Sequence, residues 1–407
     1  MKKIAIYGYG NIGNGVAQVI DKNGEIIAKR LGEPVEVKYV LDIRDFPGDF
    51  MESKVVHDVD TIVKDPEIEV VCETMGGVEP AYTFTRKALE AGKSVCTSNK
   101  ELVAARGPEL LQIAKDHNCS YLFEASVGGG IPIIRPMNSS LVPEEIRSIT
   151  GILNGTTNFM LTRMAKDGAD YDQVLAKAQE LGYAERNPEA DVEGKDAARK
   201  IAILASLMAG KTYPYEKVMT KGITKVTARD FAYAKAIGMQ IRLLATARMN
   251  EQGEIAAFVE PCMLPEEHPL ARVEDVMNAV YVQGNLLGDT MYYGAGAGKL
   301  PTASAVVSDV VEALRAKGRT IPVIWENTEA ATADPAELPA AFFLRVPRVS
   351  YRDLRRALRN MDLVEIPGVL TEEVGILTDT VSQNELRNKV KDVIFKSVLR
   401  VEGLKKQ

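Results

Sequence analysis

The chain has 407 residues, of which 46% are hydrophobic and 26% charged, and its formal net charge is -6. That length exceeds what one hydrophobic core organises, so two or three domains are expected. The mild acidity, with a pI near 5.5, lacks the basic footprint of a nucleic-acid-binding protein, and no apolar run is long enough to span a membrane. Because MKKIAIYGYG is no signal peptide, we expect a cytoplasmic protein.

The cysteines and histidines argue against a zinc enzyme. None of the cysteines sits in a C-x-x-C pair, and the histidines are far apart with no H-E-x-x-H pattern. The residues concerned are Cys72, Cys96, Cys119, Cys262, His57, His117 and His268. Buried free thiols in a reducing compartment are the expectation.

Strand and helix signals alternate over the first third of the chain. Strands are predicted at 2–7, 35–42, 69–75, 94–99 and 120–126, and helices at 11–31, 80–91 and 101–117. Strands that alternate with helices across short loops predict a doubly wound parallel sheet, an α/β Rossmann domain over 1–130.

The pattern changes after Gly128-Gly129-Gly130. Helices are predicted at 155–166, 171–180 and 195–209, and strands at 241–249, 255–264, 276–284 and 289–296. Short connections between these strands are typical of antiparallel pairing, so 131–300 is interpreted as an α+β domain. A strong helix at about 301–318 is expected to return to the first domain, and 319–340, rich in Ala, Pro and acidic residues, to be a linker.

The last 67 residues, 341–407, form a third predicted unit. Strands are expected at 342–346, 365–370, 373–381 and 395–402, and helices at 351–360 and 382–393. This order, βαββαβ, is the split βαβ, ferredoxin-like arrangement.

The segment Gly8-Tyr9-Gly10-Asn11-Ile12-Gly13 is a G-x-G-x-x-G motif between a predicted strand and a predicted helix. The glycines allow a tight turn, close approach of a pyrophosphate and close helix–strand packing. The helix N-terminus then offers free N–H groups to the phosphates. In this context the motif favours dinucleotide binding over a merely structural glycine turn.

Two residues at the end of the second strand bear on the choice between NAD and NADP. Asp42 is placed to bond the ribose hydroxyls of NAD, and Arg44 to pair with the extra phosphate of NADP. An ordinary solvated charge at Arg44 is an equal alternative, so the choice stays open.

Two lysines are candidate catalytic residues. Asp196 and Lys200 are four residues apart on one predicted helix face. From spacing alone they read as a surface ion pair, whereas a desolvated lysine held by a carboxylate can protonate a developing alkoxide. Lys100 follows a strand end in SVCTSNK, at the edge where open α/β sheets bind ligands, and the helix dipole disfavours a merely solvated cation there.

At this point the sequence resembles the homoserine dehydrogenase family along nearly its whole length. The matching motifs are GYGNIG, TSNKELVA, FEASVGGGIPII, GILNGTTNFMLTRM, LGYAERNPEADVEGKDAARK and YYGAGAGKLPTASAVVSD, in the order of the family. The resemblance implies reversible, NAD(P)H-dependent reduction of L-aspartate 4-semialdehyde to L-homoserine, in the pathway to threonine, methionine and isoleucine.

The resemblance also implies roles for individual residues. Lys200 resembles the proton donor, Asp196 the aspartate that holds the substrate hydroxyl, Lys100 a second lysine near substrate and nicotinamide, and Glu185 the glutamate that binds the substrate ammonium. The remaining candidates are Gly182, Asp191 and Thr156 for substrate, and Gly8, Gly10, Asn11, Ile12, Gly13, Asp42, Arg44, Thr74, Ser98, Lys100, Gly296 and Gly298 for the cofactor. The last two glycines resemble a loop that closes over the nicotinamide.

The segment FEASVGGGI resembles the monovalent-cation site of the family. A sodium-like ion there would use the Glu124 carboxylate and oxygens of Val127, Gly129 and Ile131, as a hard cation prefers, and would fix the hinge between domains.

The C-terminal unit resembles the ACT domain attached to many of these enzymes, where threonine is the effector. Its first strand–helix turn, VPRVSYRD, lacks the usual aspartate–proline–glycine pattern, so association and threonine binding both remain as its role. The middle domain of the family pairs into dimers, which implies a homodimer or homotetramer here.

Two other functions are alternatives for this sequence. A semialdehyde enzyme with a covalent thiol intermediate needs an activated cysteine beside a base, and the cysteines here lie in apolar runs. A non-catalytic sensor would bind a dinucleotide and an amino acid without turnover, and the dense acidic and lysine content of 185–200 argues against it.

Overall fold

The computed structural model describes residues 1–358, 360–366, 372–391 and 393–404. It divides into two compact units, each built from three stretches of chain. The first unit contains 1–145, 202–213 and 292–330, and the second contains 146–201, 214–291 and 331–407. Within the described residues no helix is both long and apolar enough to cross a membrane.

The first unit holds a six-stranded parallel sheet in the order β3-β2-β1-β4-β5-β6, the Rossmann order. Its strands are β1 (Lys2–Tyr7), β2 (Val35–Leu41), β3 (Val55–Val56), β4 (Ile68–Glu73), β5 (Ser94–Thr97) and β6 (Tyr121–Leu122). Its helices are α1 (Asn11–Leu31), α2 (Val59–Val63), α3 (Ala81–Glu90), α4 (Lys100–Asp116), α5 (Ile134–Asn138) and α11 (Lys299–Ala316). The predicted parallel sheet is therefore confirmed.

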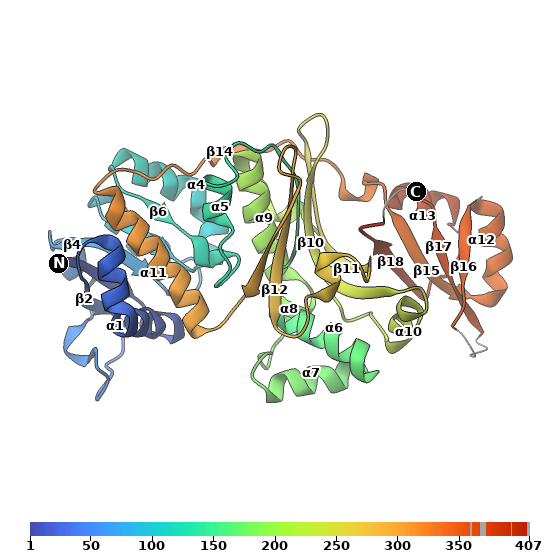
Figure 1. Ribbon diagram of the computed structural model, residues 1–407, viewed down its shortest axis with the longest axis horizontal. Coiled ribbons are helices and arrows are strands. Elements are labelled where there is room, and N and C mark those ends of the chain that lie inside the picture. The colour runs from blue at the N-terminus through green and yellow to red at the C-terminus, as the bar shows by residue number, and fades with distance from the viewer. Residues whose placement is uncertain (359, 367–371, 392, 405–407) are drawn as a thin grey trace. The chain divides into compact units, whose positions relative to one another are not determined.

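Helix α11 comes from far along the sequence and packs against α1 (Figure 1). The two helices and the sheet share one apolar core, in which Val16, Ile20, Val306 and Val310 are buried. Two short strands, β8 (Lys211–Thr212) and β14 (Glu326–Glu329), form a separate pair in the same unit.

The second unit contains a mixed sheet with long antiparallel strands at its centre. Its strands are β7 (Ile146–Ile152), β9 (Met219–Thr220), β10 (Met239–Met249), β11 (Ile255–Pro265), β12 (Met277–Gly284) and β13 (Asp289–Ala295). The helices are α6 (Gly155–Asp167), α7 (Tyr171–Glu180), α8 (Glu189–Val192), α9 (Lys195–Ala209) and α10 (Ala228–Ala236). The boundary between the units falls within α9 and β13.

The C-terminal segment has the order βαββαβ. Its elements are β15 (Ala341–Pro347), α12 (Tyr351–Ala357), β16 (Met361–Val364), β17 (Glu373–Thr378), α13 (Gln383–Lys389) and β18 (Ser397–Val401). The strands lie in the order β18-β15-β17-β16, which is the antiparallel ferredoxin-like arrangement. Parallel pairing of β18 with β11 makes this sheet continuous with the middle sheet (Figure 1).

The predicted strand at 120–126 is wrong beyond Leu122. Residues Glu124–Ser126 form a 3-10 turn, because the backbone N–H of Glu124 donates to the side chain of Asp309 (2.9 Å) instead of to a neighbouring strand. The apolar residues of this segment are buried all the same, so burial alone was a poor guide to strand geometry.

Several element bounds in the last third of the chain also differ from the prediction; the helix expected at 382–393, for example, is α13, which ends at Lys389. The strand expected at 365–370 is instead β16, whose last pair is Val364 with Gly375; Glu365 and Ile366 lie after it, and 367–370 fall outside the described residues. The helix expected at 351–360 ends at Ala357. The segment 319–340 contains β14 and a buried Trp325, whose indole donates to Thr212 (3.1 Å).

Candidate active site

The glycine motif forms the turn between β1 and α1. Gly8 has φ +82°, which favours glycine, and Gly10 is the N-cap of α1. A Cβ atom on Gly13 would lie 2.1 Å from the carbonyl oxygen of Gly8, so the turn closes only with glycine there. The free N–H groups at the start of α1 therefore lie directly beside the glycine loop, which is the arrangement that binds a pyrophosphate.

Thr74, at the end of β4, lies against this loop. Its hydroxyl donates to the carbonyl oxygens of Gly8 (2.7 Å) and Tyr7 (3.1 Å). Ser98 lies after β5, where its N–H donates to the carbonyl of Glu73 (3.3 Å). The structure therefore brings the predicted cofactor residues Thr74 and Ser98 to the carboxyl edge of the sheet together with the glycine loop.

Asp42 and Arg44 pair with each other. The Arg44 Nε and Nη2 donate to the two Asp42 oxygens at 2.9 and 3.0 Å, and the Tyr9 N–H donates to Asp42 at 2.8 Å. Burial by itself would raise the pKa of Asp42, but these bonds lower it to about 2. The Arg44 side chain remains 59% exposed and lies 5.0 Å from the Phe46 ring centroid, so a guanidinium is presented where the ribose end of a dinucleotide is expected.

A buried glutamate, which sequence reasoning missed, ties two loops at this edge. Glu73 is fully buried and accepts hydrogen bonds from the Thr97 hydroxyl (2.5 Å) and the Met75 N–H (2.8 Å). Thr97 in turn accepts from the N–H of Asn99 (2.9 Å), whose side chain caps α4 directly before Lys100. A carboxylate at the end of the apolar run EVVCE was the signal that could have found it.

In the second unit, Lys200 and Asp196 are buried rather than solvated. The Lys200 side chain is 10% exposed, and its ammonium lies 2.8 Å from Asp196 Oδ2 and 2.7 Å from the carbonyl oxygen of Leu153. A lysine ammonium has three N–H donors. Two are used here, and among the described residues no further acceptor contacts the third.

Asn154 is a second residue that sequence reasoning missed. Its Nδ2 donates to Asp191 (2.7 Å) and Asp196 (3.0 Å), and its Oδ1 accepts from the N–H of Thr157 (2.9 Å) as the N-cap of α6. Only Leu153 and Asn154 separate β7, which ends at Ile152, from α6, which begins at Gly155. An asparagine before a helix start was the available signal.

The other expected substrate residues lie nearby in the chain. The Thr156 hydroxyl donates to the carbonyl of Tyr183 (2.6 Å), which joins the start of α6 to the turn after α7. Gly182 is in that turn with φ +74°. Glu185 is exposed, and its carbonyl accepts from Gln179 (3.1 Å). Lys100 belongs to the first unit.

The segment 128–130 packs against the loop before α11. A Cβ atom on Gly129 would lie 2.2 Å from the carbonyl oxygen of Gly296, and the N–H of Gly130 donates to Ala295 (3.0 Å). Gly298 is the N-cap of α11 with φ +115°. The two glycine-rich segments are therefore in backbone contact, as a returning loop requires.

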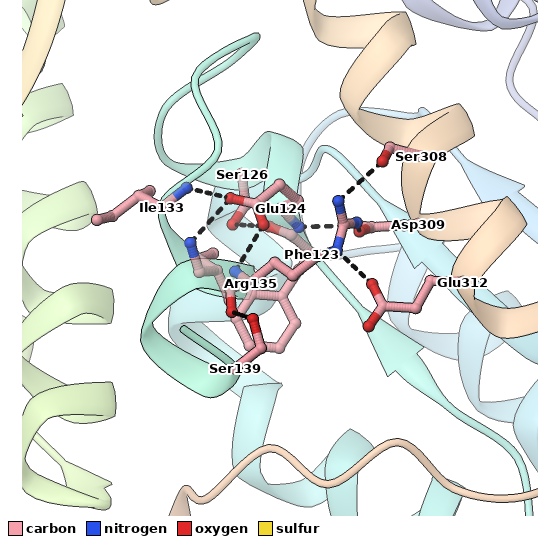
Figure 2. Close-up of polar contacts among 10 residues, drawn as sticks. Phe123, Glu124, Ser126, Ile133, Arg135, Ser139, Ser308, Asp309 and Glu312 are labelled. Carbon is pink, nitrogen blue, oxygen red and sulfur yellow. Dashed lines mark hydrogen bonds and ion pairs between the residues drawn. The ribbon is translucent and has the colours of Figure 1, made fainter. Parts of the chain in front are cut away.

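Figure 2 shows where the Glu124 carboxylate points. Its oxygens accept from the backbone N–H groups of Ile133 (2.6 Å), Ile134 (2.8 Å) and Arg135 (2.6 Å), at the start of α5. The Arg135 guanidinium is held by Asp309 and Glu312 of α11 and by Ser308 (2.8 Å).

These three hydrogen bonds do not fit the Glu124 carboxylate as the main ligand of a cation, because they take most of its lone pairs. Within the described residues no group of three or more His, Cys, Asp or Glu side chains could hold a metal ion. The expected cation would therefore depend on backbone carbonyls.

The Rossmann strand order and the glycine turn between β1 and α1 define a dinucleotide-binding protein. Two family models match the chain: "Homoserine dehydrogenase, NAD binding domain" at 8–124 and "Homoserine dehydrogenase" at 132–311. The chain belongs to the homoserine dehydrogenase family and is an NAD(P)-dependent enzyme of that family.

Relatives and solved structures agree with this assignment. The chain is 39% identical over 351 residues to a homoserine dehydrogenase of Bacillus subtilis (84% of this chain, 81% of the relative) and 38% identical over 393 residues to one of Pseudomonas aeruginosa (94% and 88%). A crystal structure of a homoserine dehydrogenase from Thiobacillus denitrificans matches with TM-score 0.88 and 34% identity, covering 98% of each chain. A hyperthermophilic archaeal homoserine dehydrogenase in complex with NADPH matches with TM-score 0.65 and 30% identity, covering 77% of this chain and 98% of that one.

Gly13→Ala is expected to abolish NADP(H) binding, because the new methyl group would overlap the Gly8 carbonyl oxygen. Titration of nicotinamide fluorescence measures this. Gly24→Ala is the matched control, since it lies in the same helix with no atom within 4 Å of its Cβ position. It should leave binding intact and stabilise the helix by roughly 0.5–1 kcal/mol. Equal binding by both variants would contradict the assignment of the loop.

Glu73→Gln is expected to change how stability depends on pH. Burial raises the pKa of Glu73 to about 7, although its hydrogen bonds oppose this. As pH rises from its ordinary pKa of 4.5 to about 7, the unfolded chain loses this proton and the folded chain keeps it. The wild type should therefore lose about 3 kcal/mol of stability over that range that the glutamine variant does not lose.

Denaturant unfolding of both proteins at pH 5 and pH 8 checks the expected change for Glu73. The quantity to compare is the difference in the free energy of unfolding between variant and wild type at each pH. Asp42→Asn is the control. Because the pKa of Asp42 is about 2, the difference in unfolding free energy between Asp42→Asn and the wild type should stay constant over this range. A constant difference for Glu73→Gln would show that Glu73 ionises normally.

Proposed function

We propose that the buried network around Lys200 is the catalytic centre for the reversible, NAD(P)H-dependent reduction of L-aspartate 4-semialdehyde to L-homoserine. The single observation that carries this proposal is the desolvated Lys200 ammonium, held between Asp196 and the Leu153 carbonyl with one donor remaining. It is supported by family membership and by relatives named for this activity. The pathway to threonine, methionine and isoleucine is part of the same proposal.

Lys200 is the proposed proton donor. When bound, the nicotinamide supplies or accepts the hydride. Charge then develops on the carbonyl oxygen of the semialdehyde, and the remaining N–H of Lys200 delivers a proton there. Asp196 keeps the ammonium in place and holds the hydroxyl of homoserine. Lys100, at the edge of the Rossmann sheet, is the proposed second lysine near substrate and nicotinamide.

Asp191 and Glu185 are the proposed partners of the α-ammonium group of the substrate. The side-chain amide of Asn154 donates to both Asp191 and Asp196. This bridge fixes the position of the proposed ammonium-binding Asp191 relative to the proton donor Lys200. Thr156 and Gly182 shape the same side by joining the start of α6 to the turn after α7.

The dinucleotide is proposed to lie over Gly8, Gly10, Asn11, Ile12 and Gly13, with Thr74 and Ser98 near the nicotinamide and Gly296 and Gly298 in the loop that closes over it. Arg44 is proposed to pair with the 2′-phosphate of NADP, while Asp42 orients its guanidinium. An NADPH complex of a family member supports a nicotinamide cofactor.

The C-terminal unit is proposed to be an ACT-like domain, on the support of its ferredoxin-like strand order. Association of chains is its proposed role, with threonine as the candidate effector, and pairing through the middle domain is proposed to give a homodimer or homotetramer. A sodium-like cation, if held, would be bound by the carbonyls of Val127, Gly129 and Ile131, and no step of the mechanism passes through it.

Lys200→Ala is expected to lower kcat for homoserine oxidation by on the order of a hundredfold or more, with NADP(H) binding intact. The assay follows absorbance at the nicotinamide band with homoserine and either coenzyme. Lys166→Ala is the matched control, because it removes an exposed lysine at the end of α6 that pairs with Glu274. Unchanged turnover in Lys200→Ala would remove Lys200 from the mechanism, and a wild type without turnover would overturn the function.

Arg44→Ala is expected to raise KM for NADP by about tenfold and to leave KM for NAD nearly unchanged, because only NADP carries the 2′-phosphate. Initial rates with each coenzyme measure this ratio. Arg86→Ala, which removes an exposed arginine of α3 paired with Glu90, serves as the control. An equal effect on both coenzymes would show that Arg44 acts only by holding Asp42.

A further inference from the structure

A buried arginine of the C-terminal unit contacts the middle sheet. Arg400, on β18, is fully buried, and its Nε donates to Glu260 Oε1 on β11 (2.7 Å). The Cζ atom of its guanidinium also lies 4.7 Å from the ring centroid of Phe258 and 5.3 Å from that of Phe342. A buried charge of this kind is retained only with a well-held partner, so Arg400 and Glu260 hold each other at the junction of β11 and β18.

The second oxygen of Glu260 pairs with the ammonium of Lys221. Lys221 follows the short strand β9, which runs parallel to β11, and its N–H donates to the carbonyl of Val259 (2.7 Å). The segment 219–224 is therefore fixed to β11 at both its backbone and its side chain, and the charge that fixes it is shared with Arg400.

The other side of the segment 219–224 contacts the turn 191–196, which leads from α8 into α9, the helix that carries Lys200. The N–H of Ile223 donates to the carbonyl of Val192 (2.8 Å), and the Thr224 hydroxyl donates to Glu193 (3.1 Å). A Cβ atom on Gly222 would lie 2.2 Å from the Val192 carbonyl oxygen. The backbones are thus in direct contact, without room for a side chain at position 222.

That turn carries residues of the proposed catalytic network at both ends. Asp191 is its first residue and Asp196 its last, and both accept hydrogen bonds from the Asn154 side-chain amide. Gly194 in the turn has φ +78°, and a Cβ atom there would lie 3.0 Å from a Val259 methyl group. A shift of the segment 219–224 would therefore move Asp191 relative to Asp196.

We propose that Arg400, Glu260 and Lys221 form an ion-pair chain that positions the turn 191–196 for substrate binding, so that β18 of the C-terminal unit contributes to the substrate site through residues that never touch the substrate. These three are positioning residues. The inference rests on the proposed roles of Asp191, Asp196 and Lys200, and its test is chosen so that it can fail while those roles stand.

The test compares Lys221→Met, Arg400→Met and their double variant with the wild type. Each single variant should lower kcat/KM for homoserine on the order of ten- to a hundredfold, mainly through KM, because small misplacements of binding groups have effects of this size. NADP(H) affinity, read from nicotinamide fluorescence, should not change. Because the residues act in series, the double variant should lose no more than the worse single variant.

Lys221→Arg keeps a cation for Glu260 and should restore most of the lost kcat/KM. Arg248→Met is the matched control: Arg248 on β10 pairs with Glu402, directly after β18, so it breaks an ion pair at the same junction that does not reach the segment 219–224. It should leave KM for homoserine within about twofold of the wild-type value, since an unrelated pair has no route to the turn.

Two results would overturn the proposal: an unchanged KM for homoserine in Lys221→Met, or losses that multiply in the double variant. If Arg400→Met does not fold, Lys221→Met and Lys221→Arg decide the matter, because the Lys221 side chain is 38% exposed and tolerates replacement. Failure of the catalytic assignment would look different, since Lys200→Ala would then keep its turnover.

Discussion

Charge taken out of water is the constraint that organises this molecule. A buried ammonium or carboxylate is costly unless hydrogen bonds and an opposite charge replace its hydration. Lys200 meets that requirement with the Asp196 carboxylate and the carbonyl oxygen of Leu153. Asp196 in turn accepts a hydrogen bond from the Asn154 side chain, which also donates to Asp191. The lysine is therefore held in one place and in a poorly hydrated environment, where a single remaining donor is directed and strong. An exposed ion pair with the same spacing would have neither property.

The same requirement explains how irregular segments of the first unit are held in place. Glu124 has no strand neighbour, but its carboxylate collects three consecutive N–H groups at the start of α5, and Arg135 is fixed to α11 in return. Glu73 joins the ends of β4 and β5 in a similar way, because its side chain accepts hydrogen bonds from the Met75 N–H and the Thr97 hydroxyl. In each case one buried carboxyl group makes the hydrogen bonds that a regular element would have provided. Loops can then present N–H groups and side chains to a ligand without being loose.

Sequence reasoning succeeded where the determining contacts are local. The glycine turn needs only its own residues and the flanking strand and helix, and the pairing of Asp196 with Lys200 follows from one turn of helix. It failed where the partner is distant. Asn154 acts on Asp196 from 42 positions away, and the N–H of Glu124 is taken by a residue 185 positions further on. Nothing in the neighbouring letters encodes those contacts, so the strand at 120–126 was extended too far and the bridging amide was missed.

The continuity of the two sheets in the second unit is also a non-local feature, and it changes how the C-terminal unit is understood. Composition and order alone suggested a separate module joined by a linker. Parallel pairing of β18 with β11 places a strand of that module beside the strand that holds the segment 219–224. The ion pairs of Glu260 with Arg400 and with Lys221 link β18 to that segment. A C-terminal unit attached in this way shares one continuous sheet with the middle strands, irrespective of whether it binds an effector.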